Sequence, residues 1–185
     1  MDEPELQRHY REDVRKKLCV THCYANAHEV PALQKVVINS AIGADADKST
    51  IEEIARDIAL ISCQKPVIIR ARKSISNFKL RAGMPNGIKV TLRGHMMYFF
   101  VLKFIKIALP AIRDFHGISP HFDGNGNFTV GVRDYSIFPE INVDREKKVV
   151  GMDVTFRTTA KTDREAFDLL EFLGMPFTKK RGVAA

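Results

Sequence analysis

Three segments in the second half of the chain alternate apolar and polar residues with a period of two. Apolar residues occupy every second position of 88–92, 128–132 and 152–156, and threonine, lysine, arginine, glycine or aspartate fills the places between and beside them. Successive side chains of a strand point to opposite faces, so each segment has one apolar and one polar face. The sequence therefore predicts an α+β fold, in which helices pack on one face of an antiparallel sheet of about five strands.

The remaining elements are predicted from local patterns. β-branched residues favour strands over 33–39 and 65–71. Helical spacing predicts helices over 3–18, from about Lys48, over 96–109, and from Thr162 to a stop at Gly174. Potential capping boxes precede two of these helices. They pair Ser49 with Glu52, Thr50 with Glu53, and Thr162 with Glu165, and the last helix turns Phe167, Leu170 and Leu173 inward.

The predicted domain organisation is a single domain over 1–177. Within it, residues 1–30 form a docking helix and a linker, and the apolar stripe of the helix consists of Leu6, Tyr10, Val14 and Leu18. The tail 178–185 contains two lysines and an arginine, and we expect it to be flexible.

Charge is distributed unevenly along the chain. No acidic residue occurs between Asp57 and Asp114, and this window supplies the whole net charge of +7. Its basic residues are Lys65, Arg70, Arg72, Lys73, Lys79, Arg81, Lys89, Arg93, Lys103, Lys106 and Arg113. Ordinary soluble surfaces mix both signs of charge, so a long acid-free segment indicates contact with a polyanion. Nucleic acid is the partner that this pattern favours.

Residues 73–87 are predicted to form a long basic hairpin loop with Gly83, Pro85 and the turn pair Asn86-Gly87. Loops of this length in compact domains usually have a function. The polar face of the predicted sheet carries no aromatic ring, and rings are what a sheet needs to stack unpaired bases. Threonine, lysine and arginine suit hydroxyl and phosphate contacts to structured RNA instead.

Other kinds of site find less support. Cys19, His22, Cys23 and His28 do not have the spacing of a tetrahedral metal site, and Gly124-Asn125-Gly126 lacks the third glycine of a dinucleotide loop. We therefore expect no metal, no cofactor and no catalytic residue. The alternative is an RNA-acting enzyme that binds substrate through the basic window. Its acid–base groups would be the loop histidines His95, His116 and His121 with Asp114 or Asp123.

The compartment is predicted from cysteine usage and hydropathy. Three cysteines, an odd number, and an N-terminus without an apolar segment indicate a reducing compartment: the cytoplasm, with an organellar matrix or stroma left open. The most apolar stretch, 96–109, is too short to span a bilayer and is interrupted by Lys103 and Lys106. No membrane association is expected.

Nearly the whole chain resembles the bacterial and organellar branch of ribosomal protein five of the large subunit, the 5S-rRNA-binding protein. The resemblance rests on CQKPVIIRARKSISNFKLRAGMPNGIKVTLRG at 63–94, ALPAIRDFHGIS at 108–119, FDGNGNFTVGVRD at 122–134, IFPEI at 137–141 and GMDVTFRTTAKTDREAFDLLEFLGMPF at 151–177. It implies an antiparallel sheet of about five strands with helices on one side. It also implies a structural constituent of the ribosome that is a monomer when free.

The resemblance further implies which residues contact RNA. Contacts to 5S rRNA would come from polar residues on the sheet face and at strand ends, namely Asn39, Gln64, Lys65, Lys89, Thr91 and Arg93. The loop would approach the P-site tRNA through Lys73, Ser74, Lys79 and Arg81. Residues 135–150 would face a small-subunit head protein and help to form a bridge between the subunits. Adjacent large-subunit rRNA and neighbouring ribosomal proteins are the remaining implied partners.

Five residues depart from those that are usual in the family. Cys63 replaces a glycine, Ser40-Ala41 replaces Met-Gly, and Met96 and Ala111 each replace an arginine. If those arginines contact rRNA in relatives, this chain either binds less tightly or compensates through Lys103 or Lys106.

Overall fold

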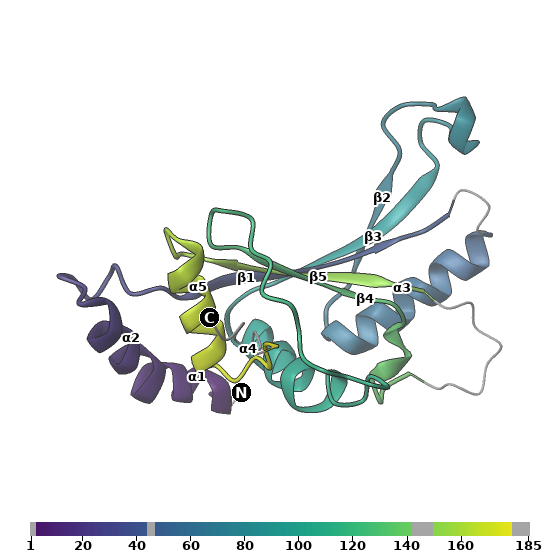
Figure 1. Cartoon of the computed structure of the whole chain (residues 1–185). Coiled ribbons are helices and arrows are strands. Elements are labelled where there is room, and N and C mark those ends of the chain that lie inside the picture. The colour runs from purple at the N-terminus through teal and green to yellow at the C-terminus, as the bar shows by residue number, and fades with distance from the viewer. Residues whose placement is uncertain (1–2, 44–46, 142–149, 179–185) are drawn as a thin grey trace, which may run out of the picture.

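A computed structural model describes residues 3–43, 47–141 and 150–178, and Figure 1 shows their arrangement. Within them lies a five-stranded sheet with the strand order β2-β3-β1-β5-β4, in which every neighbouring pair is antiparallel. The strands are β1 Leu33–Ala41, β2 Val67–Arg70, β3 Pro85–Leu92, β4 Phe128–Val132 and β5 Met152–Thr158. The predicted α+β class, the antiparallel sheet and the strands of the second half are confirmed.

The register of the central strand β1 aligns the apolar and polar positions of β3 and β5. Asn39 pairs with Lys89 of β3 on one side and with Asp153 of β5 on the other. One residue earlier, the buried Ile38 lies between Val90 and Val154. Apolar side chains of neighbouring strands therefore share one face, and polar side chains share the other.

Helices cover the apolar face, which lies toward the bottom of Figure 1. They are α1 Glu5–His9, α2 Arg15–His22, α3 Lys48–Ser62, α4 Gly94–Lys103 and α5 Asp163–Phe172, with π-helical turns at Tyr10–Val14 and Phe104–Ala108. In the described part of the chain, no helix combines the length and hydrophobicity that crossing a membrane requires.

The first helical segment runs from Glu5 to His22 and carries the predicted apolar stripe. Leu6, Val14 and Leu18 are buried, and Tyr10 is half-buried with its hydroxyl donating to Pro31 O at 2.8 Å. Residues four apart drift by about 40° per step around an ideal α-helix. The wider π-helical turn at Tyr10–Val14 reduces this drift. One stripe can therefore contact both α4, beside α1, and α5, beside α2.

Aromatic rings join α4 and the π-helical turn that follows it to the sheet. The ring of Phe104 lies 5.9 Å from that of Phe100, 6.4 Å from that of Phe138 and 5.9 Å from that of Phe156 in β5. Phe128 of β4 continues the series at 6.2 Å from Phe156. All five side chains are buried. The helix predicted over 96–109 is thus a core element, although Phe99 and Ile107 of its apolar run remain exposed.

Helix caps follow the sequence prediction at one helix only. Thr162 caps α5, because its hydroxyl accepts from Glu165 N at 3.4 Å. The two capping boxes predicted for α3 are wrong: the helix begins at Lys48, its N-cap residue is Asp47, and no side chain makes a cap hydrogen bond. Ser49 and Thr50 lie one and two residues inside the helix, where neither can serve as N-cap.

The inward face of α5 differs partly from its prediction. Leu170 and Leu173 are buried as predicted, together with Leu169. Phe167 is only half-buried, and its ring lies 4.7 Å from that of Phe177. This aromatic residue therefore helps to hold the C-terminal segment rather than filling the main core.

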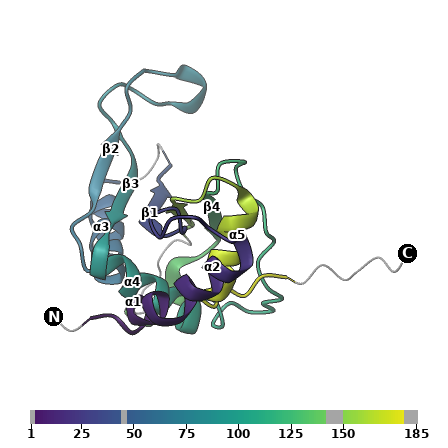
Figure 2. The ribbon, with the colours of Figure 1, turned by 90° about the vertical axis from the view of Figure 1, so that its left-hand side faces the viewer.

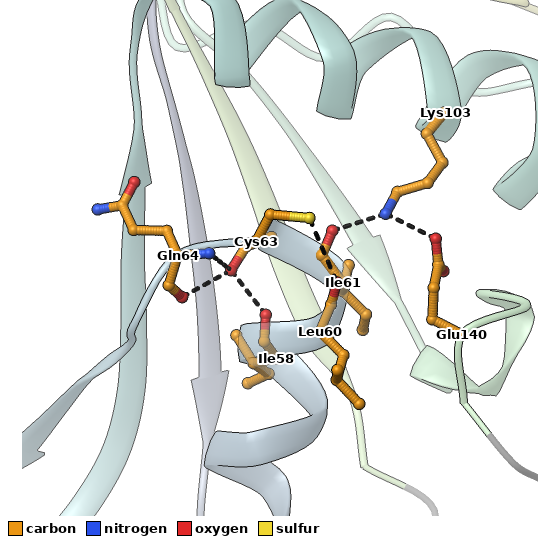
Figure 3. Close-up of polar contacts among 8 residues, drawn as sticks. Ile58, Leu60, Ile61, Cys63, Gln64, Lys103 and Glu140 are labelled. Atoms are coloured by element: carbon orange, nitrogen blue, oxygen red, sulfur yellow. Dashed lines mark hydrogen bonds and ion pairs between the residues drawn. The ribbon is translucent and has the colours of Figure 1, made fainter. Parts of the chain in front are cut away.

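The end of α3 is stabilised by a polar cluster, which Figure 3 shows in close-up. Ser62 Oγ lies 2.7 Å from Ile58 O and 3.0 Å from Gln64 O. Lys103 Nζ donates to Ile61 O at 2.6 Å and to Glu140 Oε1 at 2.9 Å. Lys106 is paired with Glu5 at 3.3 Å. Lys103 therefore has two partners inside the protein, and it could bind an RNA phosphate only by losing both contacts.

Cys63 is the C-cap residue of α3 and has left-handed backbone angles, with φ of 51°. A side chain in this conformation costs roughly 1–2 kcal/mol, because Cβ crowds the following carbonyl oxygen. Glycine avoids this cost and is the residue that helices prefer at such ends. Cys63 therefore places a strained residue at the junction between α3 and β2.

We expect Cys63→Gly to raise the free energy of unfolding by about 0.5–1 kcal/mol, since the relief of strain exceeds the added freedom of the unfolded chain. Chemical denaturation measured by circular dichroism checks this change. Cys63→Ala is the matched control, because it removes the thiol and keeps the strained Cβ. An equal gain in Cys63→Ala would attribute the effect to the thiol and contradict the prediction.

Candidate nucleic-acid interface

The face of the sheet opposite the helices, here called the open face, is polar. On β1, β3, β4 and β5, the residues at alternate positions face this side. They are Lys35, Val37 and Asn39 of β1, Lys89 and Thr91 of β3, Thr129 and Gly131 of β4, and Asp153, Thr155 and Arg157 of β5. No aromatic ring occurs among them, as the sequence predicted.

The strand register sets the neighbours on this face. Adjacent strands lie about 4.8 Å apart, so directly paired residues stand side by side. Asn39 lies between Lys89 and Asp153, and Thr91 is opposite Val37 in the next row. On β4 and β5, the hydroxyl oxygens of Thr129 and Thr155 are 3.1 Å apart. The face thus presents amide, ammonium and hydroxyl groups over β3, β1, β5 and β4, with Val37 among them and the apolar Val67 and Ile69 of β2 at its margin.

The sequence-predicted rRNA contacts gather at the β2–β3–β1 side of this face. Lys89 and Asn39 are direct neighbours, and Arg93 follows the last residue of β3 and precedes α4. Gln64 and Lys65 lie just before β2, whose first residue pairs with Lys89. The α3 end positions Gln64, whose amide points away from the polar cluster in Figure 3. Asn39 and Thr91 are half-buried, and the other predicted contacts are exposed.

Among the described residues, the basic groups at this site have no acidic partners. Within the described ranges, no ion pair involves Lys65, Lys89 or Arg93. The acid of the open face, Asp153, is separated from Lys89 by Asn39. Positive charge on β2 and β3 is therefore uncompensated and available to an external anion.

Two basic residues of the open face were not assigned to the site from sequence. Lys35 of β1 and Arg157 of β5 are direct partners in the register, although a bulge interrupts the ladder beside them. The alternation of Lys35, Val37 and Asn39 along β1 could have identified the first, because these positions share a face. Lys35 and Arg157 extend the positive surface from β3 to β1 and β5.

The hairpin between β2 and β3 projects beyond the sheet at the top of Figure 1. Ala71 N donates to Met84 O at 2.8 Å, and Ile75 and Leu80 exchange hydrogen bonds of 2.8 and 3.1 Å. Its loop differs from the predicted 73–87, because β3 already begins at Pro85. The loop proper is 71–84.

Asn86-Gly87 is part of β3 rather than a turn. Asn86 O accepts from Ile42 N at 3.0 Å, and Gly87 pairs with Ala41 of β1. A Cβ on residue 87 would lie 3.1 Å from Ser40 O. The glycine therefore permits close approach of two strands, which overrides the turn preference of the dipeptide.

The loop tip is a short 3₁₀ turn at Ser76–Phe78, followed by Lys79 with φ of 51°. The predicted tRNA-contacting residues Lys73, Lys79 and Arg81 are exposed around it. Ser74 has an internal role, since its hydroxyl accepts from Ala82 N at 2.9 Å. Phe78 was not predicted and is 69% exposed. The aromatic residue beside Lys79 in a basic loop was the available clue, since rings stack on bases.

The glycine-rich turn at 124–126 is occupied by the protein's own carboxylates. Asp163 accepts from Gly124 N at 3.1 Å and from Gly126 N at 2.9 Å. Asp123 accepts from Asn127 Nδ2 at 2.7 Å, and the hydrogen bonds from Asn127 lower the pKa of this carboxyl. These main-chain N–H groups are not free to bind a phosphate, and Asp123 is held as an acceptor rather than poised as an acid.

Two further sequence predictions concern metal ligands and the 135–150 segment. Among the described residues, no group of three or more histidine, cysteine or acidic side chains could hold a metal ion.

Of the segment 135–150, a 3₁₀ turn at Tyr135–Ile137 is described, followed by buried Phe138 and Ile141. Burial raises the pKa of Tyr135, whose hydroxyl donates to Asp57 at 3.0 Å. Residues 142–149 and most of the tail, 179–185, lie outside the described residues.

Comparisons with known proteins establish the family. Residues 26–81 match the family model described as ribosomal protein L5, and 85–177 match the model of the C-terminus of the same family. The large ribosomal subunit protein uL5 of Caldanaerobacter subterraneus is 53% identical, covering 94% of this chain and 98% of that protein. The uL5 of Thermus thermophilus is 52% identical, covering 94% and 97%. The chain therefore belongs to the ribosomal protein L5 family, whose members are structural constituents of the large ribosomal subunit rather than enzymes.

Proposed function

We propose that this protein anchors 5S rRNA in the large ribosomal subunit through the β2–β3–β1 side of its open face. The observation that carries the proposal is the placement of Lys89 beside Asn39, with Thr91 in the next row and no acidic partner for Lys89 among the described residues. These groups stand on a rigid sheet whose other face is core. The interface is therefore preorganised, and binding requires little ordering of the backbone.

Each proposed contact has suitable chemistry. The amides of Asn39 and Gln64 and the hydroxyl of Thr91 can hydrogen-bond 2′-hydroxyls and phosphate oxygens, which distinguish structured RNA. The guanidinium of Arg93 can bind a phosphate through two parallel hydrogen bonds. Lys65 and Lys89 supply compact charges that release counterions from the RNA. We include Lys35 and Arg157 as contacts to the same RNA or to adjacent large-subunit rRNA.

The hairpin has a separate task in this proposal. Its loop extends away from the sheet and carries Lys73, Lys79 and Arg81 in a stretch of sequence without acidic residues. We assign these residues to the backbone of the P-site tRNA, and Ser74 to the internal support of the loop. The segment that includes Tyr135 to Ile141 would help to form the bridge to a small-subunit head protein. The protein would work in the cytoplasm or in an organellar matrix or stroma, where its three free thiols stay reduced.

Arg93→Ala is predicted to weaken binding to 5S rRNA by about 1–3 kcal/mol, since a charged contact to nucleic acid is lost. Filter-binding titrations of the purified protein at one fixed salt concentration measure this change. Arg164→Ala is the matched control: it removes the same charge from the exposed surface of α5, on the helix side. Equal loss in both variants would show that only net charge matters and would reject the assigned face.

The double variant Lys79→Ala/Arg81→Ala is predicted to release P-site tRNA faster by about one order of magnitude, because two phosphate contacts disappear. Its affinity for free 5S rRNA should stay within about twofold of the unchanged protein. Ribosomes reconstituted with each variant provide the tRNA dissociation rates. Arg8→Ala/Lys16→Ala removes the same charge from α1 and α2 and serves as the control. Loss of 5S rRNA binding in the loop variant would refute the division of tasks.

A further inference from the structure

The outermost strand of the sheet, β2, has one side that no other strand of the described chain covers. Val67 and Ile69 pair with Lys89 and Gly87 of β3, and β2 stands at the end of the strand order. Figure 2 shows β2 at the outer margin of the molecule. An exposed strand edge presents unpaired N–H and C=O groups that can receive another chain.

The main-chain direction identifies which residues of β2 face outward. Ala71 N donates to Met84 O, and Ala71 O accepts from Gly83 N, so both groups of Ala71 face the β3 side. The ladder is irregular between Ile69 and Arg70, so the direction of Val67 and Ile69 is taken from β3. Asn86 O accepts from Ile42 N and faces β1, so Gly87 and Lys89 face β2, and their partners Ile69 and Val67 face β3. Ile68 and Arg70, which alternate with the residues that face β3, therefore face outward. In the part of the chain that is described, no hydrogen bond outside the β2–β3 ladder involves the main chain of Ile68 or Arg70.

The side chains of this edge are apolar, in contrast to the basic loops that flank it. Val67 is 66% exposed, Ile68 41% and Ile69 39%. Three consecutive branched apolar residues contribute nothing to phosphate binding, and their exposure on an edge strand favours contact with a protein. An added strand would lie beside Val67 and Ile69 on the open face and beside Ile68 on the other.

Charge decides which protein segment fits. Arg70 and Arg72, which the RNA-binding proposal does not use, flank the edge together with Lys65, which it does use. The nearest acidic residues along the chain are Asp57 and Asp114. A second copy paired antiparallel about Ile68 would bring Lys65 close to Arg70 and Arg72 of its partner, and like charges at this distance repel. Pro66 and the short length of β2 further limit self-association. A segment with acidic flanks would instead be attracted.

We propose that β2 is a docking edge for an extended segment of a partner protein, with apolar residues at alternate positions and acidic residues on either side. The segment adds a strand to the sheet through hydrogen bonds to the main chain of Ile68 and Arg70. Because this edge lies beside the open face rather than on it, the docked segment leaves Asn39 and Thr91 uncovered. The docking function is additional to the RNA-binding function proposed above.

The probe for the experiment is a fluorescein-labelled peptide with two valines flanked by paired aspartates and glutamates, and a counterpart with lysine flanks. Fluorescence anisotropy with the full chain measures both affinities at one salt concentration. We expect the acidic peptide to bind at least about tenfold more tightly than the basic one, since the flanking charges differ in sign. Equal affinities would overturn the proposed occupant.

Ile68→Pro tests the main-chain contact directly. Proline removes the outward N–H of residue 68 and leaves the ladder with β3 intact, which edge strands tolerate. We expect acidic-peptide affinity to fall about tenfold, in line with one lost hydrogen bond and an altered strand edge. Ile68→Val keeps the N–H and the branched apolar side chain, and should bind within about twofold of the unchanged protein. Unchanged binding by Ile68→Pro would refute strand addition.

Amide hydrogen exchange in the unchanged protein provides a test that needs no variant. The acidic peptide should slow exchange at Ile68 and Arg70, while Val67 and Ile69, already paired with β3, change little. Absence of slowing at Ile68 and Arg70 would refute the proposal even if the peptide bound elsewhere. Slowing of these two amides by polyuridylate RNA, and not by the peptide, would show that the edge binds RNA and would also overturn it.

Discussion

The register of β1 between β3 and β5 is the constraint on which the rest of the structure depends. It pairs Asn39 with Lys89 and with Asp153, and it aligns Ile38 with Val90 and Val154. A slip by one residue would move every side chain of β1 to the opposite face. The packing of Phe104 against Phe156 and the neighbourhood of Asn39 and Lys89 therefore depend on the same hydrogen-bond ladder. Core and RNA-binding surface are specified together.

The period-two pattern was sufficient to predict the sheet's two faces, because alternation is a local property that burial enforces along the whole strand. The helix over 96–109 was predictable from its apolar run, which ends at Pro110, although the fold is needed to show that Phe99 and Ile107 of this run stay exposed. Local patterns failed where distant groups compete. Asn86-Gly87 looks like a turn, yet pairing with Ala41 and contact with Ile42 draw both residues into β3. The capping boxes predicted at Ser49 and Thr50 were also wrong, because α3 begins at Lys48 and its N-cap residue is Asp47.

In the candidate site, too, local patterns could be read from the sequence, whereas contacts between distant residues could not. Residues that alternate along one strand, such as Lys89 and Thr91, could be grouped from sequence, whereas their nearness to Asn39 required the register. Lys103 belongs to the acid-free window, but its partners Ile61 and Glu140 lie 42 and 37 residues away in sequence. No sequence pattern reveals such contacts. The positive window therefore includes an external surface on β2, β3 and the hairpin, a lysine that stabilises the end of α3, and Lys106, which pairs with Glu5.

Lysine reactivity in the presence and absence of 5S rRNA tests the central claim most directly. An amine-acetylating reagent followed by mass spectrometry reports the exposure of each lysine in the unchanged protein. If RNA binds the open face, Lys89 and Lys35 should become protected while Lys16 and Lys17 on α2 stay reactive. Protection of Lys16 and Lys17 with Lys89 still reactive would place the RNA on the helix side and contradict the account.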